Sequence, residues 1–451
     1  MLSLEYPAHG IPDIIAIIRD RWNGIDSRPA PPYGESMPKS SLFDQARFPA
    51  LGMLVLALLT ASSCTGEGER LHILTDRKEI ASAAEMYGTA NPGTIVTFRH
   101  VDAVDAAAIE RERPDVVIAS GLSAPEITVL LRSREPGLET YGTLLGQEDS
   151  ARRTRLTPLS FTLPLIAGTT ETMALLPDPV TVKERELREV AETRTVVDTQ
   201  GRPIRLGFSP EWNPETFVDL LLVRDIDVLA LGPEFADEEL VAETVEEIRR
   251  WRESIPGGAE ADAAFDEKYR YIPDAYLLLD GRISFARFTF DEWSVLPDEM
   301  TKNLDIRYFK GERHIPVTSI VSAGITRESR SPKSAEALIE WLTETETQIA
   351  LIDRWERDDI NVFGFLGGLS SNREINETVL QERFPSFTDK IPEGHYLSAP
   401  AAFPHHWARI RDEVIHPWYR AVLADASRAG TLADAYRRWE LSSMNDAEED
   451  E

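Results

Sequence analysis

The most constraining feature of the sequence is the alternation of short apolar runs with helical patterns that begins after residue 70. The apolar runs are LHILTD (71–76), TIVTFRHV (94–101) and DVVIASG (115–121). Helical patterns lie between them in KEIASAAEMYGTANPG (78–93), which ends in an Asn-Pro-Gly turn, and in DAAAIERERP (105–114). This repeated order of strand and helix predicts an α/β fold built on a parallel sheet with right-handed crossovers.

The ends of the first and third apolar runs are candidate ligand contacts. In open sheets of this kind, ligands bind beyond the carboxyl ends of the strands. Thr75 and Asp76 end the first run, and Ser120 and Gly121 end the third. We therefore expect these four residues to lie at a binding site.

Two long extended segments suggest that the chain crosses twice between two lobes. They are LTPLSFTLPLIAG (156–168) and HIPVTSIVSAGI (314–325), and a new strand and helix pattern lies between them. The second lobe is therefore expected to be inserted into the first, and a cleft between lobes is a natural ligand site. The expected division is 71–165 and 315–355 for lobe 1, 166–314 and 356–440 for lobe 2, and 441–451 for a disordered acidic tail.

The segment before the first apolar run has the pattern of an export signal. Residues 37–63 begin with basic residues, continue with an apolar run and end in small residues. The apolar run is shorter than the roughly 20 residues of a membrane-spanning helix. Cys64, the single cysteine, follows directly, in TASSC. We expect 1–36 to be an upstream extension that is not part of the native protein, and 64–70 to be a tether.

The overall charge argues against nucleic acid as a partner. The chain has 48 Lys and Arg against 77 Asp and Glu, which gives a net charge of −29. Such a surface repels polyphosphate. One cysteine also excludes an intrachain disulfide framework and any metal cluster that needs several thiols.

The sequence has no recognisable catalytic or metal motif. The short signatures of serine hydrolases, zinc proteases, P-loop proteins and dinucleotide-binding proteins are absent. If HHWARIRDEVIH (405–416) is helical, His405 and His416 lie about 16 Å apart, too far to share an ion. This absence disfavours an enzyme without excluding one, because the two carboxylates of a glycosidase leave no local signature. We expect no enzymatic activity, cofactor or metal.

Aromatic residues in loops are the candidates for stacking against an apolar ligand face, with polar neighbours for hydroxyl groups. Core packing is the alternative role for each of them. Residues in LGGLSSN (366–372) could add a close backbone approach or a hydroxyl, and a helix-capping turn is their alternative role. The candidates are Trp212, Asn213, Phe285, Arg287, Phe288, Trp293, Gly367, Gly368, Ser370 and Ser371.

The order of these pieces resembles the extracellular solute-binding proteins of ABC importers, the sugar-binding group in particular. The resemblance is carried by ILTD, PDVVIASG, YLLLDGRISFA, SAEALIEWLTETETQIAL and GFLGGLSSNREINETVL, in this order along the chain. TASSC likewise resembles the lipobox of bacterial lipoproteins, in which the cysteine is lipidated. The usual leucine three residues before the cysteine is missing.

These resemblances imply a two-lobed periplasmic-binding-protein fold of type II, with crossing strands around a central cleft. They imply a receptor in the cell envelope or periplasm, anchored to the membrane through a lipid on Cys64. It would bind a small solute, with a carbohydrate favoured, and deliver it to the transmembrane subunits of an ABC permease. Two alternatives stay open: a surface glycan hydrolase that uses two carboxylates, and a receptor for a peptide, polyamine or anion.

Overall fold

The computed structural model describes residues 69–133, 141, 144, 154–231, 235–400, 402–404 and 406–449. The predictions for the upstream extension, the signal, Cys64 and most of the tether lie outside the described residues, as does His405. None of the described helices combines the length and apolar character needed to span a bilayer.

The first lobe is built on a six-stranded sheet with the order β13-β4-β12-β3-β1-β2. β1 pairs in parallel with β2 and β3, so the prediction for the first three strands is confirmed. The later strands β12, β4 and β13 join antiparallel. The strands are β1 (Glu69–Thr75), β2 (Thr94–His100), β3 (Val116–Ser120), β4 (Leu156–Thr162), β12 (Ser319–Ile325) and β13 (Leu369–Ser370).

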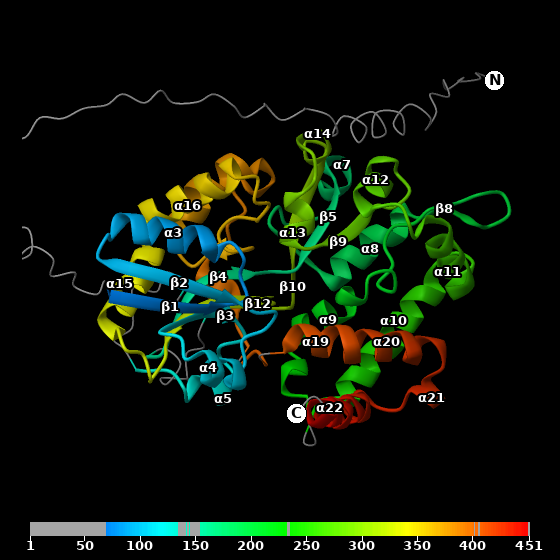
Figure 1. Cartoon of the computed structure of the whole chain (residues 1–451). Coiled ribbons are helices and arrows are strands. Elements are labelled where there is room, and N and C mark those ends of the chain that lie inside the picture. Colours follow the sequence, from blue (N-terminus) through cyan, green and yellow to red (C-terminus); the bar gives the residue numbers. More distant parts are fainter. Residues whose placement is uncertain are drawn as a thin grey trace, which may run out of the picture. The chain divides into compact units, whose positions relative to one another are not determined.

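Helices cover both faces of this sheet (Figure 1). Alternate residues of β3 face opposite ways: Val116 and Ile118 pack with the helices α3, α15 and α16, whereas Val117 packs with α4 and α5. Burial on both faces explains why the strands are almost continuously apolar. The helices are α3 (Ile80–Ala90), α4 (Ala106–Glu112), α5 (Pro125–Thr128), α15 (Pro332–Thr343) and α16 (Thr345–Arg357).

The second lobe has a four-stranded sheet with the order β6-β10-β5-β9. Its strands are β5 (Leu165–Thr169), β6 (Thr181–Lys183), β9 (Phe285–Phe288) and β10 (Leu304–Lys310). Its helices are α7 (Thr170–Met173), α8 (Glu184–Arg194), α9 (Pro214–Val223), α10 (Glu238–Ser254), α11 (Gly258–Tyr269), α12 (Asp274–Leu279), α13 (Phe290–Ser294) and α14 (Asp298–Thr301). A small hairpin, β7 (Val196–Val197) and β8 (Pro203–Arg205), projects from this lobe (Figure 1).

The two sheets are joined where strands continue from one lobe to the other. β4 and β5 are separated by only two residues, and β10 leads through β11 (Ile315–Pro316) into β12. A third connection runs beside β11, where β14 (Leu397–Ser398) pairs with it in parallel. Between β13 and β14 lie the short helical turns α17 (Arg373–Ile375), η2 (Asn376–Leu380), α18 (Gln381–Arg383), η3 (Pro385–Phe387) and η4 (Gly394–Tyr396).

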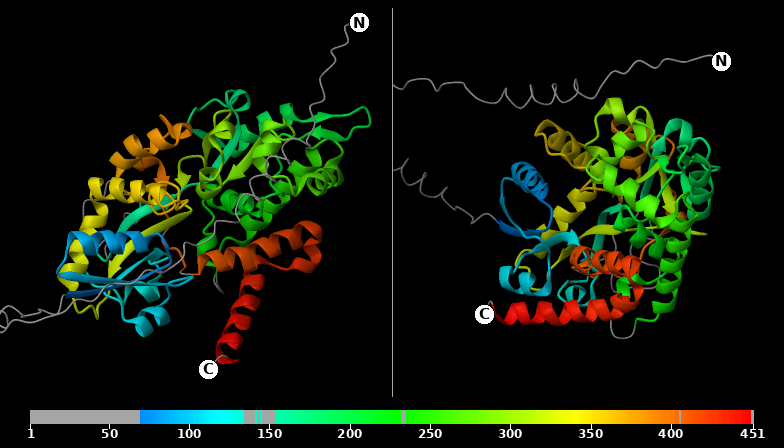
Figure 2. Two further views of the ribbon diagram at one scale, coloured as in Figure 1. Left: turned by 45° about the horizontal axis from the view of Figure 1, so that its top comes forward. Right: turned by 90° about the vertical axis from the view of Figure 1, so that its right-hand side faces the viewer.

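The last part of the chain packs on the second lobe as a layer of helices. α20 contacts both α9 and α10. Figure 2 shows α22 leaving the layer of α19 and α20 at an angle. The elements are α19 (Trp407–Ile410), η5 (Arg411–Ile415), α20 (His416–Ala424), α21 (Ala426–Ala429) and α22 (Leu432–Glu449).

Two predictions about the end of the chain are wrong. Residues 356–440 were assigned wholly to lobe 2, but β13 pairs with β4 of the first sheet. A strand of two residues, Leu-Ser, at a sheet edge is too short to be recognised from its sequence. The acidic tail was expected to be disordered from residue 441, but α22 continues to Glu449. Leu441, Met444, Ala447, Glu448 and Glu449 in this segment favour helix.

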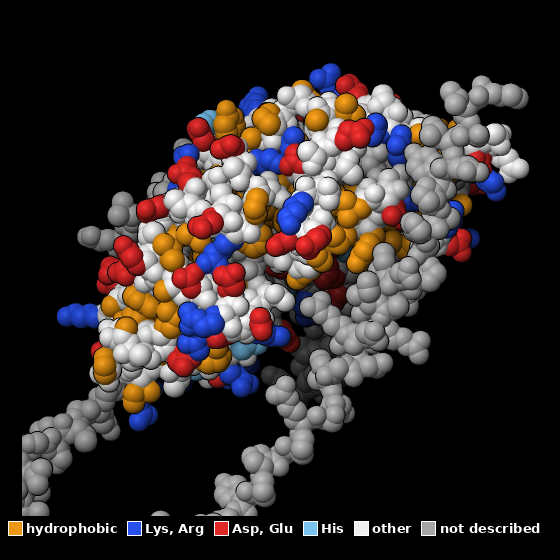
Figure 3. Space-filling model, turned by 90° about the horizontal axis from the view of Figure 1, so that it is seen from above, with side chains coloured by type: hydrophobic (Ala, Val, Ile, Leu, Met, Phe, Trp, Pro, Cys, Tyr) orange, Lys and Arg blue, Asp and Glu red, His pale blue; other side chains and the backbone are white. Residues whose placement is uncertain are grey.

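Figure 3 shows one face of the molecule with its side chains coloured by type. Acidic and basic side chains are interspersed on this face, and apolar side chains lie between them. Over the described residues of this face, the basic side chains form no continuous area. The mixture is typical of a solvated surface.

Candidate ligand-binding site

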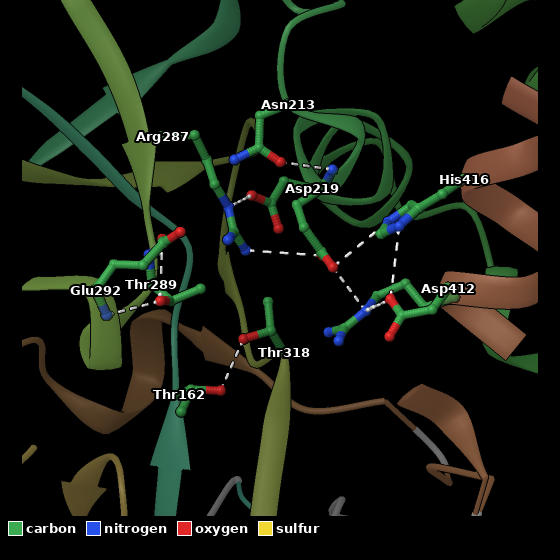
Figure 4. A network of polar contacts seen from close by, with 11 residues as sticks. Thr162, Asn213, Asp219, Arg287, Thr289, Glu292, Thr318, Asp412 and His416 are labelled. Atoms are coloured by element: carbon green, nitrogen blue, oxygen red, sulfur yellow. Dashed lines mark hydrogen bonds and ion pairs between the residues drawn. The ribbon is translucent and has the colours of Figure 1, made fainter. Parts of the chain in front are cut away.

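A cavity of about 220 Å³ lies between the two lobes and is lined by side chains of both. The first lobe and the crossing segments contribute Arg77, Thr162, Leu163, Thr318, Ser319 and Gly367. The second lobe and the C-terminal helices contribute Glu215, Val218, Asp219, Leu222, Arg287, Thr289, Phe290, Asp291, Trp407 and Arg411. Figure 4 shows the polar network at this place.

The side of the cavity formed by the second lobe is built on helix α9 and strand β9. Asn213 caps α9, because its Oδ1 accepts a hydrogen bond from the Glu215 N–H at 3.0 Å, and Pro214 begins the helix. Glu215 and Asp219 are four residues apart and therefore share one helix face. Arg287 on β9 donates from Nε to Asp219 Oδ2 at 2.9 Å, and its guanidinium lies 3.9 Å from Glu215. Both members of the Arg287 and Asp219 pair are buried.

The C-terminal helices supply a second charged group at the same place. Arg411 forms an ion pair with Glu215 Oε1 at 2.7 Å. His416 lies 3.4 Å from the same oxygen through Nε2 and 3.5 Å from Asp412 through Nδ1. Burial raises the pKa of Glu215, and Arg411 acts in the opposite direction. Burial lowers the pKa of His416 to about 4, so this histidine is neutral at physiological pH.

Glu215, Asp412 and His416 are close enough together to suggest a metal site. However, the Arg411 guanidinium already sits on the Glu215 oxygen that a cation would need. A divalent ion at this place would meet a fixed positive charge within a few ångströms. The arrangement is therefore an ion-pair network and not a metal centre.

Hydrogen bonds at the carboxyl ends of β1 and β3 hold the first-lobe wall of the cavity together. This is the edge of the sheet at which ligands are expected to bind. Asp76 Oδ2 accepts hydrogen bonds from the Ser120 N–H at 3.1 Å and the Ser120 hydroxyl at 2.6 Å. Asp76 Oδ1 lies 3.2 Å from Arg77 Nε, and Arg77 donates from Nη2 to the Ser120 hydroxyl at 3.3 Å. Of these three residues, Arg77 lines the cavity. The predicted residues Asp76 and Ser120 therefore orient an arginine that the sequence analysis missed.

Thr75 and Gly121 lie behind this wall. Thr75 is fully buried, and its hydroxyl oxygen accepts a hydrogen bond from the Arg77 N–H at 3.0 Å. Gly121 has a φ of +71°, which allows the chain to turn directly after β3. Both residues shape the wall, and neither lines the cavity.

Asp291 and Gly367 meet Arg77 across the boundary between the lobes. Asp291 lies in the first turn of α13 and Gly367 lies in the loop before β13. A Cβ atom on Gly367 would stand 3.7 Å from Asp291 Oδ1 and 3.8 Å from Arg77 Nη1. Partial burial raises the pKa of Asp291, and the charge of Arg77 opposes this shift. The φ of +83° at Gly367 also favours glycine at this position.

Hydroxyl groups lie where the crossing segments pass the cavity. The Thr162 and Thr318 hydroxyls are 2.8 Å apart, and either can be the donor. Thr289 caps α13, and its side chain and N–H both donate to Glu292. Figure 4 shows all three threonines around the cavity with the charged pairs. Such groups can both donate and accept hydrogen bonds.

None of the four predicted aromatic contacts lines this cavity. Phe285, Phe288 and Trp293 are buried in the core of the second lobe, where Phe288 and Trp293 pack edge to face at 5.7 Å. Trp212 donates from Nε1 to Asp262 at 3.0 Å, away from this cavity. The aromatic residues at the cavity are instead Phe290 and Trp407, which sequence reasoning missed.

Three of the predicted residues in the 366–372 loop have packing roles. Gly368 lies against the backbone of β4, where an added Cβ would be 2.3 Å from the Phe161 carbonyl oxygen. Ser370 is fully buried and donates to Gln348 at 2.6 Å. Ser371 donates to the Pro158 carbonyl at 2.7 Å. Gly367 alone of the four candidates lines the cavity.

Neither a protein-family model nor a curated protein sequence matches the chain significantly. The fold, however, is similar to solved structures. A sugar transporter from Rhizobium etli in an open conformation has a TM-score of 0.55 at 12% identity, over 81% of this chain and 97% of that chain. An ABC transporter solute-binding protein from Agrobacterium radiobacter K84, in complex with ribitol, has a TM-score of 0.52 at 13% identity, over 83% and 98%.

An ABC substrate-binding protein from Listeria monocytogenes in complex with cycloalternan has a TM-score of 0.51 at 13% identity, over 84% of this chain and 98% of that chain. Each of these three structures matches this chain over 97% or 98% of its own length. The chain therefore has the two-lobed α/β fold of the solute-binding proteins of ABC transporters, and the predicted fold class is confirmed.

Proposed function

We propose that the protein is an exported receptor that captures a carbohydrate or polyol between its lobes and delivers it to an ABC permease. The observation that carries the proposal is a polar cavity lined from both lobes, in a fold shared with solute-binding proteins. A ligand that contacts both lobes stabilises the closed arrangement, and a permease can recognise that arrangement.

The chemistry of the cavity suits a neutral ligand rich in hydroxyl groups. Arg77, Arg287 and Arg411 each pair with a carboxylate, so they do not form a free positive site for an anion. Sugar hydroxyls both donate and accept, which matches a lining of carboxylates, guanidinium groups and threonine hydroxyls. The rings of Phe290 and Trp407 add apolar surface for the carbon face of a sugar.

A thermal-shift screen of sugars, polyols, amino acids and anions tests this function. A saccharide or polyol should raise the melting temperature, because a ligand at 100 times its Kd stabilises the native state by about 2.7 kcal/mol.

Asp291→Ala should weaken binding of that ligand about 10- to 100-fold, since a hydrogen bond to a charged group contributes roughly 1.5–3 kcal/mol.

The matched control is Asp298→Ala, which removes an exposed carboxylate outside the cavity. It should leave the affinity unchanged. A shift by anions or amino acids but by no sugar or polyol would contradict the proposal. Release of shorter sugars from a bound oligosaccharide would support a hydrolase instead.

The export signal and the lipid anchor are part of the proposal and rest on the sequence. Cys64→Ser should move the protein from the membrane fraction to the soluble fraction of a bacterial host. Each buried methylene of an acyl chain contributes about 0.8 kcal/mol to membrane binding, so loss of the lipid should release nearly all of the protein. Ser62→Ala retains the cysteine and is the control. Equal membrane retention of both variants would contradict the proposal that a lipid on Cys64 anchors the protein.

A further inference from the structure

A second cavity, of about 270 Å³, lies in the second lobe and plays no part in the site described so far. It opens between the loop before α9, the end of α11 and the start of α12. The residues that matter for its chemistry are Trp212, Asn213, Phe265, Asp266, Tyr269 and Asp274. The first two are candidate ligand contacts from the sequence, although they do not line the cavity between the lobes.

One wall of the second cavity is aromatic and held in place. Trp212 stacks on Phe265 with ring centroids 5.4 Å apart and an interplanar angle of 7°, and Phe265 packs against Tyr269 at 4.7 Å. The hydrogen bond from Trp212 Nε1 to the buried Asp262 fixes the indole. Trp212 and Tyr269 are only half-buried, so part of each ring remains accessible. Flat, fixed aromatic surfaces of this kind suit the apolar face of a sugar ring.

Two acidic residues, Asp266 and Asp274, line the same cavity. Asp266 pairs with Arg270 at 2.8 Å. Asp274 accepts no hydrogen bond on its side chain from any residue that the structure describes. Burial, together with the charges of Glu292 and Asp266, raises the pKa of Asp274 to about 6. A ligand hydroxyl would give this carboxyl group the hydrogen bond that it lacks.

The second cavity adjoins the first through consecutive residues. Asn213 and Pro214 line the second cavity, and the next residue, Glu215, lines the first. Figure 4 shows Asn213 beside Arg287, at the edge of the network around the first cavity. Glu292, whose charge acts on Asp274, accepts hydrogen bonds from Thr289, a residue of the first cavity. The start of α9, residues 213–215, therefore contributes to the lining of both cavities.

The volumes of the two cavities also favour a ligand that occupies both. Small-molecule pockets usually measure roughly 300–1,000 Å³. Each of these cavities is smaller than that range, whereas the two joined fall within it. We propose that the second cavity is a subsite for a further sugar ring, so that the ligand is an oligosaccharide of at least two rings. This inference rests on the proposed function and specifies its substrate class.

The test is calorimetric titration of the purified protein with glucose, galactose, mannose and xylose and with the di- and trisaccharides of each. In at least one series, the Kd should fall 10-fold or more from the monosaccharide to the disaccharide. Tyr269→Ala and the isosteric Asp274→Asn should each remove most of this gain and leave the Kd of the monosaccharide within 2-fold. Tyr271→Ala is the control, because Tyr271 is 92% exposed and lies next to the cavity without lining it.

The outcomes separate this inference from the proposed function. Monosaccharide binding with no gain from a second ring overturns the subsite and retains the receptor. The same holds if Tyr269→Ala and Asp274→Asn weaken mono- and disaccharides equally, because the residues would then act through the fold. If no sugar of the panel binds, the subsite is overturned, and the receptor is overturned as well if no polyol binds.

Discussion

Asp219→Ala should lower the free energy of unfolding by about 3–5 kcal/mol, because it leaves the buried Arg287 without its main counter-charge. The Asp219 and Arg287 side chains are 2% and 7% exposed, and they are joined at 2.9 Å. Glu215 stands 3.9 Å from the guanidinium and already pairs with Arg411, so it compensates only in part. Chemical denaturation of both proteins at pH 7 measures the difference.

A double variant separates the charge effect from loss of packing. Asp219→Leu with Arg287→Met replaces the pair by apolar side chains of similar size, and such replacements are often neutral or stabilising. The double variant should therefore recover most of the stability that Asp219→Ala loses. A loss of less than 1 kcal/mol in the single variant, or an equal loss in the double variant, would show that the pair does not hold α9 to β9.

The strand pattern of the sequence predicted which strand ends meet behind the first-lobe wall of the candidate site. β1 and β3 are adjacent and parallel, so their carboxyl ends meet, and Asp76 and Ser120 lie in contact there. The position of Arg77 could not be predicted from the same rule. Its direction depends on the hydrogen bonds that Asp76 and Ser120 make, and these form only after the strands have paired.

The other half of the site depends on contacts between distant segments. The sequence around Trp293 suggested a loop, but its side chain turns into the core of the second lobe. Arg411 and His416 reach Glu215 because α20 packs on α9, about two hundred residues away in the chain. Helical spacing identifies which face of a segment is apolar, but not which other segment covers that face.

The burial of His416 leads to a large pH effect on stability, because the native state disfavours its protonation. Its pKa is lowered to about 4, mainly by burial and also by the charges of Arg411, Arg420 and Arg287, whereas Asp412 opposes the shift. In the unfolded chain a histidine has a pKa near 6.5. As the pH falls from 6.5 towards 4, the unfolded state therefore binds a proton that the native state excludes. This histidine's contribution is fully present above pH 6.5, and it should fall by about 2.5 kcal/mol between pH 7.5 and pH 4.5.

The comparison of wild type with His416→Gln isolates this contribution from the other titrating groups. The free energies of unfolding should be measured by denaturant titration at both pH values. The wild type should lose about 2.5 kcal/mol relative to the variant on acidification, since glutamine cannot bind the proton. His395→Gln replaces a histidine whose side chain is 63% exposed, and it should keep the wild-type profile.

If the difference between wild type and His416→Gln stays constant, His416 is accessible to protons in the native state. The packing of α20 against α9 would then be looser than the contacts at Glu215 require.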